Sequence, residues 1–275
     1  MKNLKNFLYP YYKNIPTYTF FRQIYRKLIY ISDSFKDRRL KLKIAVKEKG
    51  NYIFKIYDYG KITRMRARTF ESKEPETLNW INSFQSDEIL LDVGANIGMY
   101  SLYAAIKGYK VIAIEPDALN FSLLCLNIKI NKLYKKIIPY SIALHNCSKF
   151  SKFNVNLGEW GGSNNSFDRA LDEEMKEFKP AYSQVTYGLP LDSFIETLES
   201  FPNHIKIDVD GNEFLILKGA QNVLSNPSLK SVLIELNVNR KDYNPTLSIF
   251  KKEGFKLKSY DRNPKKTIYN HIFVR

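Results

Sequence analysis

The chain has 275 residues, of which 43 are Lys or Arg and 28 are Asp or Glu, so its formal net charge at pH 7 is +15. This length can bury a large core in one domain, or in one domain with an extension. No apolar run is long enough to span a bilayer, which excludes a membrane-spanning helix. We expect no secretory signal either, because the basic first residues lack a following apolar run and a small-residue cleavage site.

The cysteines and histidines indicate neither a disulfide nor a histidine metal site. Cys125 and Cys147 fall in a predicted helix and just after a predicted strand, without pairing or metal spacing. We expect them to be reduced thiols of a cytoplasmic protein. The three histidines, His145, His204 and His271, are too scattered to form a metal site together.

The positive charge is concentrated at the start of the chain. Residues 1–70 hold 18 Lys or Arg and 4 Asp or Glu, whereas residues 71–275 hold 25 and 24. We therefore predict a basic N-terminal extension over 1–70 and a catalytic domain over 71–275. A nucleic-acid enzyme would be expected to carry positive charge around its active cleft, so this distribution makes nucleic acid an unlikely partner.

The extension is predicted to contain a helix and a small sheet. Residues 17–32 place an apolar stripe on one helical face with basic residues beside it. Such a helix suits either peripheral contact with the inner face of a membrane or docking on the main domain, and we favour docking. Residues 41–70 alternate in polarity around Gly50 and Gly60, which predicts a β-meander.

From residue 76 onward, strands and helices alternate, which indicates a doubly wound α/β domain. Strands are predicted near residues 88–93, 110–115, 137–142, 204–209 and 231–237, and two more in the tail around a turn at Asn263-Pro264. Helices are predicted near residues 77–84, 98–107, 118–131, 213–220 and 246–253. Residues 143–190 are predicted to form a long irregular segment, and such long loops are usually functional.

The first strand of this domain ends in an acidic, glycine-containing turn. Residues 89–98 read Ile-Leu-Leu-Asp-Val-Gly-Ala-Asn-Ile-Gly, with Asp92 at the strand end. A dinucleotide site prefers G-x-G-x-x-G and places a pyrophosphate on the helix N-terminus. Asp92 would repel phosphate but suits a ligand with an ammonium or sulfonium group, both of which S-adenosylmethionine carries. We expect the turn, with Gly94, Ala95, Asn96 and Gly98, to let that ligand lie against the backbone.

The second strand ends in Glu115, 23 residues after Asp92. An acidic residue at about this distance contacts ribose hydroxyls in Rossmann-like folds. Pro116 ends the strand and Asp117 can cap the next helix. The alternative is that Asp92 and Glu115 are ordinary helix-capping acids. The spacing between them, which is that of a nucleoside-binding site, disfavours this alternative. A dehydrogenase that binds NAD is disfavoured by the acid in the glycine turn.

A third acidic strand end follows in residues 206–213, Lys-Ile-Asp-Val-Asp-Gly-Asn-Glu. Since ligands of open α/β sheets bind at the carboxyl ends of strands, Asp92, Glu115 and Asp208 should rim one crevice. Three acids there would repel one another without a cation. The cation is expected to come from the methyl donor, or from a divalent metal at Asp208.

These segments together resemble the FkbM-type family of S-adenosylmethionine-dependent methyltransferases, from about residue 69 to 257. The first acidic–glycine motif is common to many methyltransferases, and the Lys206–Glu213 motif with Leu217–Ala220 narrows the family. The resemblance rests on residues 74–80, 92–98, 115–117, 127–131, 161–163, 206–213, 217–220 and 234–235. It implies a Rossmann-like, mainly parallel seven-stranded sheet with an antiparallel C-terminal strand. It also implies a cytoplasmic enzyme that O-methylates a sugar or polyketide hydroxyl, and bacterial members resemble polysaccharide-modifying enzymes.

The sequence assigns a hypothetical role to each part of the crevice. Asp208 is the candidate general base or metal ligand, with Asp210 and Glu213 behind it, although these two also suit a turn and a helix cap. The donor would contact Asp92, Gly94, Ala95, Asn96, Gly98, Glu115, Pro116, Asp117, Ile142, Ala143, Asp208 and, by resemblance alone, Glu74. The acceptor, a sugar, nucleotide-sugar or glycan, would contact Trp160, Ser163 and Glu235.

Two other functions stay open at this point. The first is a nucleic-acid methyltransferase. Enzymes that methylate amino groups of DNA carry an Asn/Asp-Pro-Pro-aromatic motif after the fourth strand, and this chain has Asp-Val-Asp-Gly there instead. A non-catalytic module that binds a nucleoside, or uses its basic N-terminus as an adaptor, is the alternative from another class. The sequence does not specify the oligomeric state.

Overall fold

The computed structural model describes residues 39–46, 50–172, 174–260 and 266–275. The helix expected over residues 17–32 and the turn at Asn263-Pro264 lie outside them. Residues Leu40–Arg275 form one compact unit.

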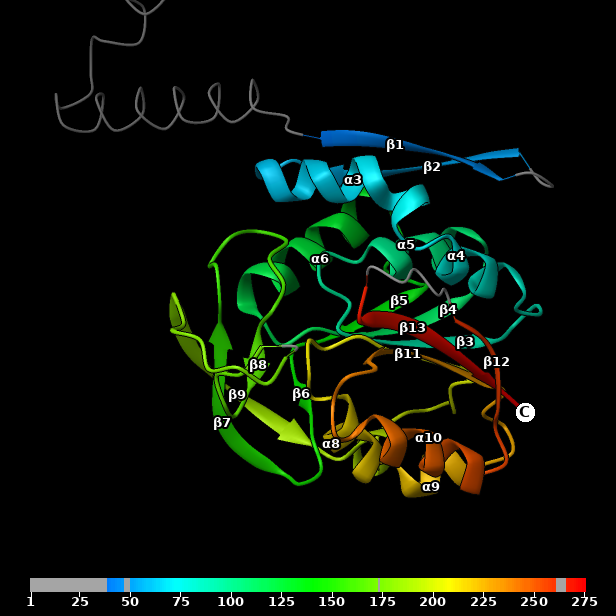
Figure 1. Ribbon diagram of the computed structural model, residues 1–275. Helices are drawn as coiled ribbons and strands as arrows, with labels where there is room; N and C mark the ends of the chain where they lie inside the picture. Colours follow the sequence, from blue (N-terminus) through cyan, green and yellow to red (C-terminus); the bar gives the residue numbers. More distant parts are fainter. Residues whose placement is uncertain (1–38, 47–49, 173, 261–265) are drawn as a thin grey trace, which may run out of the picture. The chain divides into compact units, whose positions relative to one another are not determined.

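A seven-stranded, mainly parallel sheet forms the centre of this unit (Figure 1). The strands β5, β4, β3, β10 and β11 run parallel, and β13 is antiparallel to both of its neighbours, β11 and β12. The doubly wound sheet predicted from the sequence, with an antiparallel C-terminal strand, is confirmed. In sheet order the strands are β5 (Ile137–Tyr140), β4 (Lys110–Ile114), β3 (Ile89–Val93), β10 (His204–Ile207), β11 (Ser231–Asn237), β13 (Ile268–Val274) and β12 (Lys256–Tyr260).

Helices cover both faces of the sheet, as Figure 1 shows. Successive strand residues point to opposite faces, so Leu90 joins the core on one side and Leu91 the core on the other. One side carries α4 (Pro75–Asn82), α5 (Met99–Ile106) and α6 (Ala118–Ile130), and the other carries α7 (Leu191–Ile195), α8 (Glu213–Lys218), α9 (Gln221–Ser225) and α10 (Tyr243–Lys252).

The predicted third strand of the N-terminal meander is wrong, because Lys61–Lys73 forms helix α3. Its buried residues, Thr63, Ala67 and Phe70, recur at helical spacing, and burial of this face outweighs the strand-like alternation. The first two strands do pair, as β1 (Arg39–Val46) and β2 (Gly50–Tyr57).

Strand β2 is joined to the main domain by side-chain amides of α6. Asn131 and Asn127 accept hydrogen bonds from the backbone N–H groups of Lys55 and Tyr57 at 2.8 and 2.9 Å. Phe54 is fully buried in the same core as α5 and α6. The domain boundary at residue 70 stays a prediction, although residues before it contribute to this core.

Residues 143–190 are not the irregular segment that we predicted. They contain a four-stranded sheet with the order β6 (Ala143–Leu144), β9 (Tyr182–Leu189), β7 (Lys149–Val155) and β8 (Ser166–Phe167). Phe153 and Val155 of β7 are buried, whereas Phe150, which points to the other face, is exposed. Glycines and asparagines obscured this alternation in the sequence. In Figure 1 the small sheet lies beside the carboxyl ends of the parallel strands.

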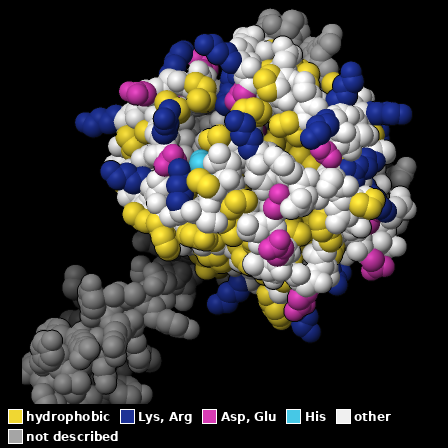
Figure 2. Space-filling view, turned by 90° about the horizontal axis from the view of Figure 1, so that it is seen from below, with side chains coloured by type: hydrophobic (Ala, Val, Ile, Leu, Met, Phe, Trp, Pro, Cys, Tyr) yellow, Lys and Arg dark blue, Asp and Glu magenta, His cyan; other side chains and the backbone are white. Residues whose placement is uncertain are grey.

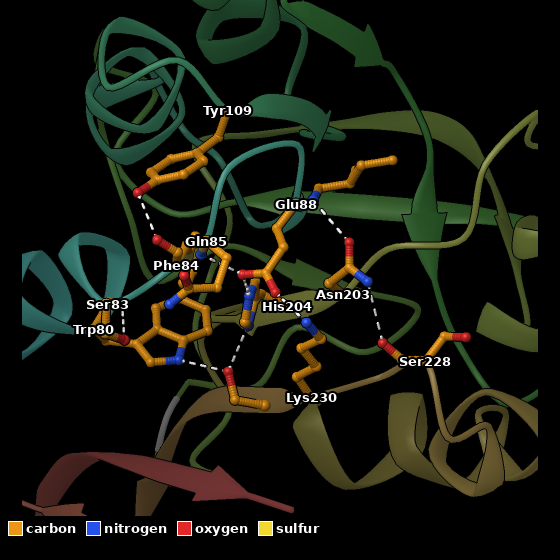
Figure 3. Close-up of polar contacts among 12 residues, drawn as sticks. Trp80, Ser83, Phe84, Gln85, Glu88, Tyr109, Asn203, His204, Ser228 and Lys230 are labelled. Atoms are coloured by element: carbon orange, nitrogen blue, oxygen red, sulfur yellow. Dashed lines mark hydrogen bonds and ion pairs between the residues drawn. The ribbon is translucent and has the colours of Figure 1, made fainter.

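A buried polar network connects the opposite, amino ends of these strands (Figure 3). His204 contacts Glu88 at 2.8 Å and Ser231 at 2.7 Å, and the Trp80 indole donates to Ser231 at 2.8 Å. Lys230 pairs with the second oxygen of Glu88. Burial works to raise the pKa of Glu88, but the hydrogen bonds from His204 and Lys230 outweigh it and lower the pKa to about 2.

We expect Glu88→Gln to lower the free energy of unfolding by about 1.5–3 kcal/mol at pH 7, because charged hydrogen bonds in a buried site are lost. Since the folded pKa of Glu88 lies below the unfolded value, its contribution is full above about pH 5 and disappears as the pH falls toward 2. The difference between wild type and variant in urea unfolding should shrink over this range. Glu174→Gln, which breaks an exposed pair with Lys176, is the control. A pH-independent difference would contradict the prediction.

Candidate active site

A cleft opens at the carboxyl ends of the parallel strands, with a volume of about 1020 Å³ including the space open to solvent. Five carboxylates and three basic side chains line it. The acidic ones are Glu74, Glu115, Asp208, Asp210 and Glu235, and the basic ones are Arg66, Lys73 and Lys206. Gly94, Ala95, Asn96, Pro116 and Ser163 also line this cleft, whereas Asp92, Gly98, Asp117, Trp160 and Glu213 lie outside its lining.

Lys206 is a buried cation in the cleft lining to which the sequence reasoning gave no role. Its side chain is 1% exposed, and its ammonium lies 2.6 Å from Asp208 Oδ2 and 5.2 Å from the centre of the Tyr100 ring. Burial works to lower the pKa of Lys206, but Asp208, Asp92 and Glu74 outweigh it and raise the pKa. A lysine inside an otherwise apolar strand was the signal available in the sequence.

Asp92 lies beneath the cleft and faces helix α5. Its carboxylate accepts a hydrogen bond from Ser101 at 2.6 Å, and its second oxygen has no hydrogen-bond partner among the described residues. Burial is the largest cause of a raised pKa for Asp92, and the Lys206 charge opposes it. Asp92 and Lys206 are register partners on adjacent strands. The expectation that only a ligand or a metal would offset the acids was therefore wrong, because the chain supplies its own cation.

The glycines of the first turn serve the packing of the protein itself. Gly94 has φ +82°, and a Cβ atom there would lie 1.8 Å from the backbone oxygen of Asp208. Gly98 has φ +88°, and its Cβ would lie 2.5 Å from Leu124. The neighbouring strand end and helix α6 fill the spaces where Cβ atoms would lie, and contact between a ligand and the backbone of this turn stays a prediction.

The same turn uses its backbone donors internally. The N–H groups of Gly94 and Ala95 both donate to Ile114 at 2.9 Å, and that of Gly98 donates to Ala95 at 2.8 Å. Asn96 donates to Glu115 at 2.7 Å, and Ile97 donates to the Asn96 side chain at 2.9 Å. A pyrophosphate would therefore compete for donors that are already bonded.

Glu115 is buried at the wall of the cleft. It accepts hydrogen bonds from the N–H groups of Asn96 and Asp117, at 2.7 and 2.8 Å. Burial is the main reason that its pKa rises to about 8. Asp117 caps α6 through Leu119 and accepts a hydrogen bond from Tyr182 at 3.1 Å, and its contact with the donor stays a prediction.

An apolar recess of about 310 Å³ adjoins the cleft and shares Gly94, Pro116, Phe153 and Val209 with it. Ile142 and Ala143, predicted to contact the donor, line this recess. Isoleucine, valine and phenylalanine side chains make most of its lining apolar.

A turn at Gly161 and Gly162 covers one side of the cleft. Asn96 and Asn120 both donate to the Gly162 carbonyl, at 2.7 and 3.0 Å, and Asn120 accepts from the Gly161 N–H at 2.8 Å. Ser163 follows this turn into the cleft lining, whereas Trp160 packs on Tyr59 with ring centres 4.7 Å apart.

The two acids after Asp208 order nearby backbone. Asp210 accepts hydrogen bonds from the N–H groups of Asn164 and Asn165, at 2.7 and 3.3 Å. Glu213 accepts from Gly211 at 3.0 Å, and burial raises its pKa to about 7. Glu213 therefore holds the turn that presents Asp208.

Glu74 and Glu235 lie at the side of the cleft near β13. Glu74 accepts hydrogen bonds from Thr77 and Asn270, both at 3.1 Å, and pairs with Lys73 at 3.1 Å. Glu235 is the register partner of Asn270. Within the described ranges, no group of three or more His, Cys, Asp or Glu side chains is placed to hold a metal ion.

Comparison with known proteins assigns the chain to a family. A sequence model described as "Methyltransferase FkbM domain" matches residues 92–257, more than half of the chain. The chain belongs to the FkbM methyltransferase family. The resemblance found in its motifs is thereby confirmed.

Two curated relatives are methyltransferases with different acceptors. A hexuronic acid methyltransferase, AglP, of Haloferax volcanii is 27% identical over 66% of this chain and 71% of its own length. A tRNA (guanine(37)-N(1))-methyltransferase of Aedes aegypti is 29% identical over 50% of this chain and 26% of its own length. The chain thus spans about a quarter of the second relative.

Among solved structures, an FkbM methyltransferase from Methylobacillus flagellatus KT aligns with 70% of this chain and 45% of its own chain, at 17% identity and a TM-score of 0.47. A precorrin-6y C5,15-methyltransferase from Geobacter metallireducens GS-15 aligns over 74% of this chain and 89% of its own chain, at 10% identity and a TM-score of 0.44.

Two further observations concern contacts with membranes and nucleic acids. None of the helices in the described part of the chain has the length and apolar character needed to cross a membrane. On the face seen in Figure 2, Lys and Arg side chains are scattered among acidic and apolar ones rather than gathered into one stripe.

We expect Lys206→Met to lower the free energy of unfolding by about 3–5 kcal/mol, because it leaves buried carboxylates without their cation. The loss should be larger at pH 8 than at pH 5, since protonation of Asp92 and Asp208 relieves their repulsion. Urea unfolding at both pH values measures it. Lys176→Met, at an exposed ion pair, is the control and should leave stability nearly unchanged. A loss for Lys206→Met below about 1 kcal/mol would show that the lysine is not needed for charge balance.

Proposed function

We propose that this chain transfers a methyl group from S-adenosylmethionine to an oxygen of a sugar, within the biosynthesis of a surface polysaccharide or another glycan. The observation that carries the proposal is the acidic cleft beside a glycine turn whose backbone donors are already bonded. Such a cleft favours a cationic nucleoside over a dinucleotide. Membership of the FkbM family supplies the reaction class.

The residues present fit this methyl donor. Glu115 would accept hydrogen bonds from the ribose hydroxyls, and the recess at Ile142 and Ala143 would hold the adenine. Met99 and Tyr100, in the first turn of α5, line the cleft, and a helix N-terminus favours a carboxylate such as that of the methionine moiety. When bound, the donor supplies an electrophilic methyl group on a sulfonium.

Asp208 is proposed to hold and accept the proton of the acceptor hydroxyl. Burial works to raise the pKa of Asp208, but Lys206, Lys73 and Arg66 outweigh it and keep the carboxylate ionised. An ionised carboxylate orients the hydroxyl as a hydrogen-bond acceptor and takes its proton as the new bond forms. The salt bridge to Lys206 fixes the position of Asp208 and makes it a poor choice for a metal ligand.

A sugar acceptor is supported by the relative that acts on hexuronic acid. In this chain, Ser163, Asn165 and Glu235 offer hydroxyl, amide and carboxylate groups to the same cleft. Sugars present hydroxyls that both donate and accept, which suits such a mixed lining. A transfer assay against nucleotide-sugars and extracted glycans, with and without chelator, tests acceptor and metal dependence together.

The relative that acts on tRNA makes RNA the second candidate acceptor. The basic residues before position 70 favour it, whereas the nearly balanced charge of residues 71–275 does not. Transfer to tRNA that exceeds transfer to every glycan would replace the sugar proposal.

Calorimetry with S-adenosylhomocysteine tests the donor site. Because the pKa of Glu115 is raised to about 8, the ionised form that accepts from ribose is scarce at pH 6.5 and predominates at pH 9. We expect the affinity to rise several-fold over this interval. Glu115→Gln should bind more weakly at pH 9 and lose most of this rise, which separates Glu115 from titration of the ligand. No binding by the wild type would favour a non-catalytic adaptor.

Asp208→Asn tests the proton acceptor. We expect at least about a 100-fold loss in the rate of methyl transfer, because proton transfer by a positioned group contributes this much or more. The affinity for S-adenosylhomocysteine should change by less than about threefold. A variant that binds the donor product and methylates at a near wild-type rate would remove Asp208 from this role.

A further inference from the structure

One wall of the cleft comes from helix α3. Its residues Arg66, Thr69 and Lys73 recur three and four positions apart, so they share one face of the helix, and all three line the cleft. The family match begins at residue 92, after this helix has ended. The α3 wall, defined by these three residues, therefore lies before the matched part of the chain.

Arg66 is held in place but keeps binding capacity. Its Nε donates to the Gly161 carbonyl at 2.7 Å, and Gly161 is held in turn by Asn120 at 2.8 Å. Among the described residues, no hydrogen-bond or ion-pair partner is found for its two terminal nitrogens. This bond fixes the guanidinium plane and leaves a planar pair of donors of the kind that binds carboxylates and phosphates.

Lys73 adds a second cation to this wall. Its ammonium pairs with Glu74 at 3.1 Å, and its side chain is 58% exposed, so it can contact a ligand as well. Burial works to lower the pKa of Lys73, but Glu74 and Asp208 outweigh it and raise the pKa, so the side chain is charged at neutral pH. Arg66 and Lys73 both act on Asp208, which places two cations beside the proposed proton acceptor.

We propose that the α3 wall binds an anionic group on the acceptor, so that the substrate is an acidic or phosphorylated sugar rather than a neutral one. The proposal rests on the proposed function and adds the charge of the acceptor to it. A carboxylate or a phosphate bound at Arg66 and Lys73 would anchor the sugar while one of its oxygens reaches Asp208. With a neutral sugar, the two terminal nitrogens of Arg66 would have no charged partner among the described residues.

The position of Arg66 favours the acceptor over the donor as the source of this anion. Its hydrogen bond joins it to Gly161, two residues before Ser163, and thus to the segment proposed to contact the sugar. The donor carboxylate has the first turn of α5 instead. If the α3 wall bound the donor, its substitution would weaken binding of S-adenosylhomocysteine.

The experiment compares three small sugars on the full chain saturated with S-adenosylhomocysteine. Glucuronic acid carries a carboxylate, glucose 1-phosphate carries a phosphate, and glucose carries neither. Ligand-observed NMR measures their dissociation constants. We expect at least one anionic sugar to bind about tenfold or more tightly than glucose, as one or two charged hydrogen bonds would give. The anionic sugar that binds more tightly shows whether the α3 wall prefers a carboxylate or a phosphate on the acceptor.

The variants assign this preference to the α3 wall. Arg66→Gln and Lys73→Gln should each reduce the preference for the anionic sugar severalfold. Arg66→Lys keeps the charge but not the planar pair of donors, so its preference should lie between those of the wild type and Arg66→Gln. Arg68→Gln, on the same helix but outside the cleft lining, is the matched control and should behave as the wild type. Thermal unfolding checks that each variant is folded.

Two results would overturn the proposal. Glucose binding as tightly as both anions would show that the cleft does not select charge. A tenfold loss of S-adenosylhomocysteine affinity in Arg66→Gln, with the sugars unaffected, would assign the wall to the donor. If the wild type binds an anionic sugar through Arg66 but never binds S-adenosylhomocysteine, the proposed function fails while the anion site stands.

Discussion

The ion cluster of Lys206 with Asp92 and Asp208 is the interaction on which the cleft depends. A lysine in the middle of a parallel sheet is costly to bury, and only nearby carboxylates make it tolerable. The cluster in turn keeps Asp208 ionised and holds it at one place beside the cleft. Asp92 and Lys206 are register partners on adjacent strands. The strand pairing that forms the sheet therefore also places a cation beside the carboxylates at the carboxyl ends of these strands.

The glycine turn shows how a sequence motif and its apparent purpose can differ. Its glycines are required because Asp208 and Leu124 lie where side chains would otherwise be. The turn therefore fixes the distance between β3 and β10, and with it the position of the acids. The N–H groups of residues 94–98 are bonded within the protein, so a diphosphate lying on the turn would have to compete for them.

Much of the fold could be predicted from the sequence, but the charge balance of the site could not. Strand alternation and helix period located the elements of the sheet, because burial on two faces gives apolar strands between amphipathic helices. The motifs also indicated that Glu115 and Asp208 lie at strand ends. They could not reveal which carboxylates accept hydrogen bonds from the backbone instead of facing a ligand. Asp210 does so through a segment 46 residues away, and Glu213 does so through the conformation of a local turn. Helix α3 was missed because its alternation is compatible with a strand until its buried face is known.

Helix α3 is the part of the cleft wall that lies outside the family match. The glycine turn, Glu115 and the ion cluster belong to residues that the family domain covers, and they suit a shared methyl donor. Helix α3 precedes that domain, and it reaches the cleft through Arg66, Thr69 and Lys73. A wall that is not constrained by the common chemistry can change its charge without loss of donor binding. Selection among acceptors is therefore expected to reside in α3 rather than in the motifs that define the family.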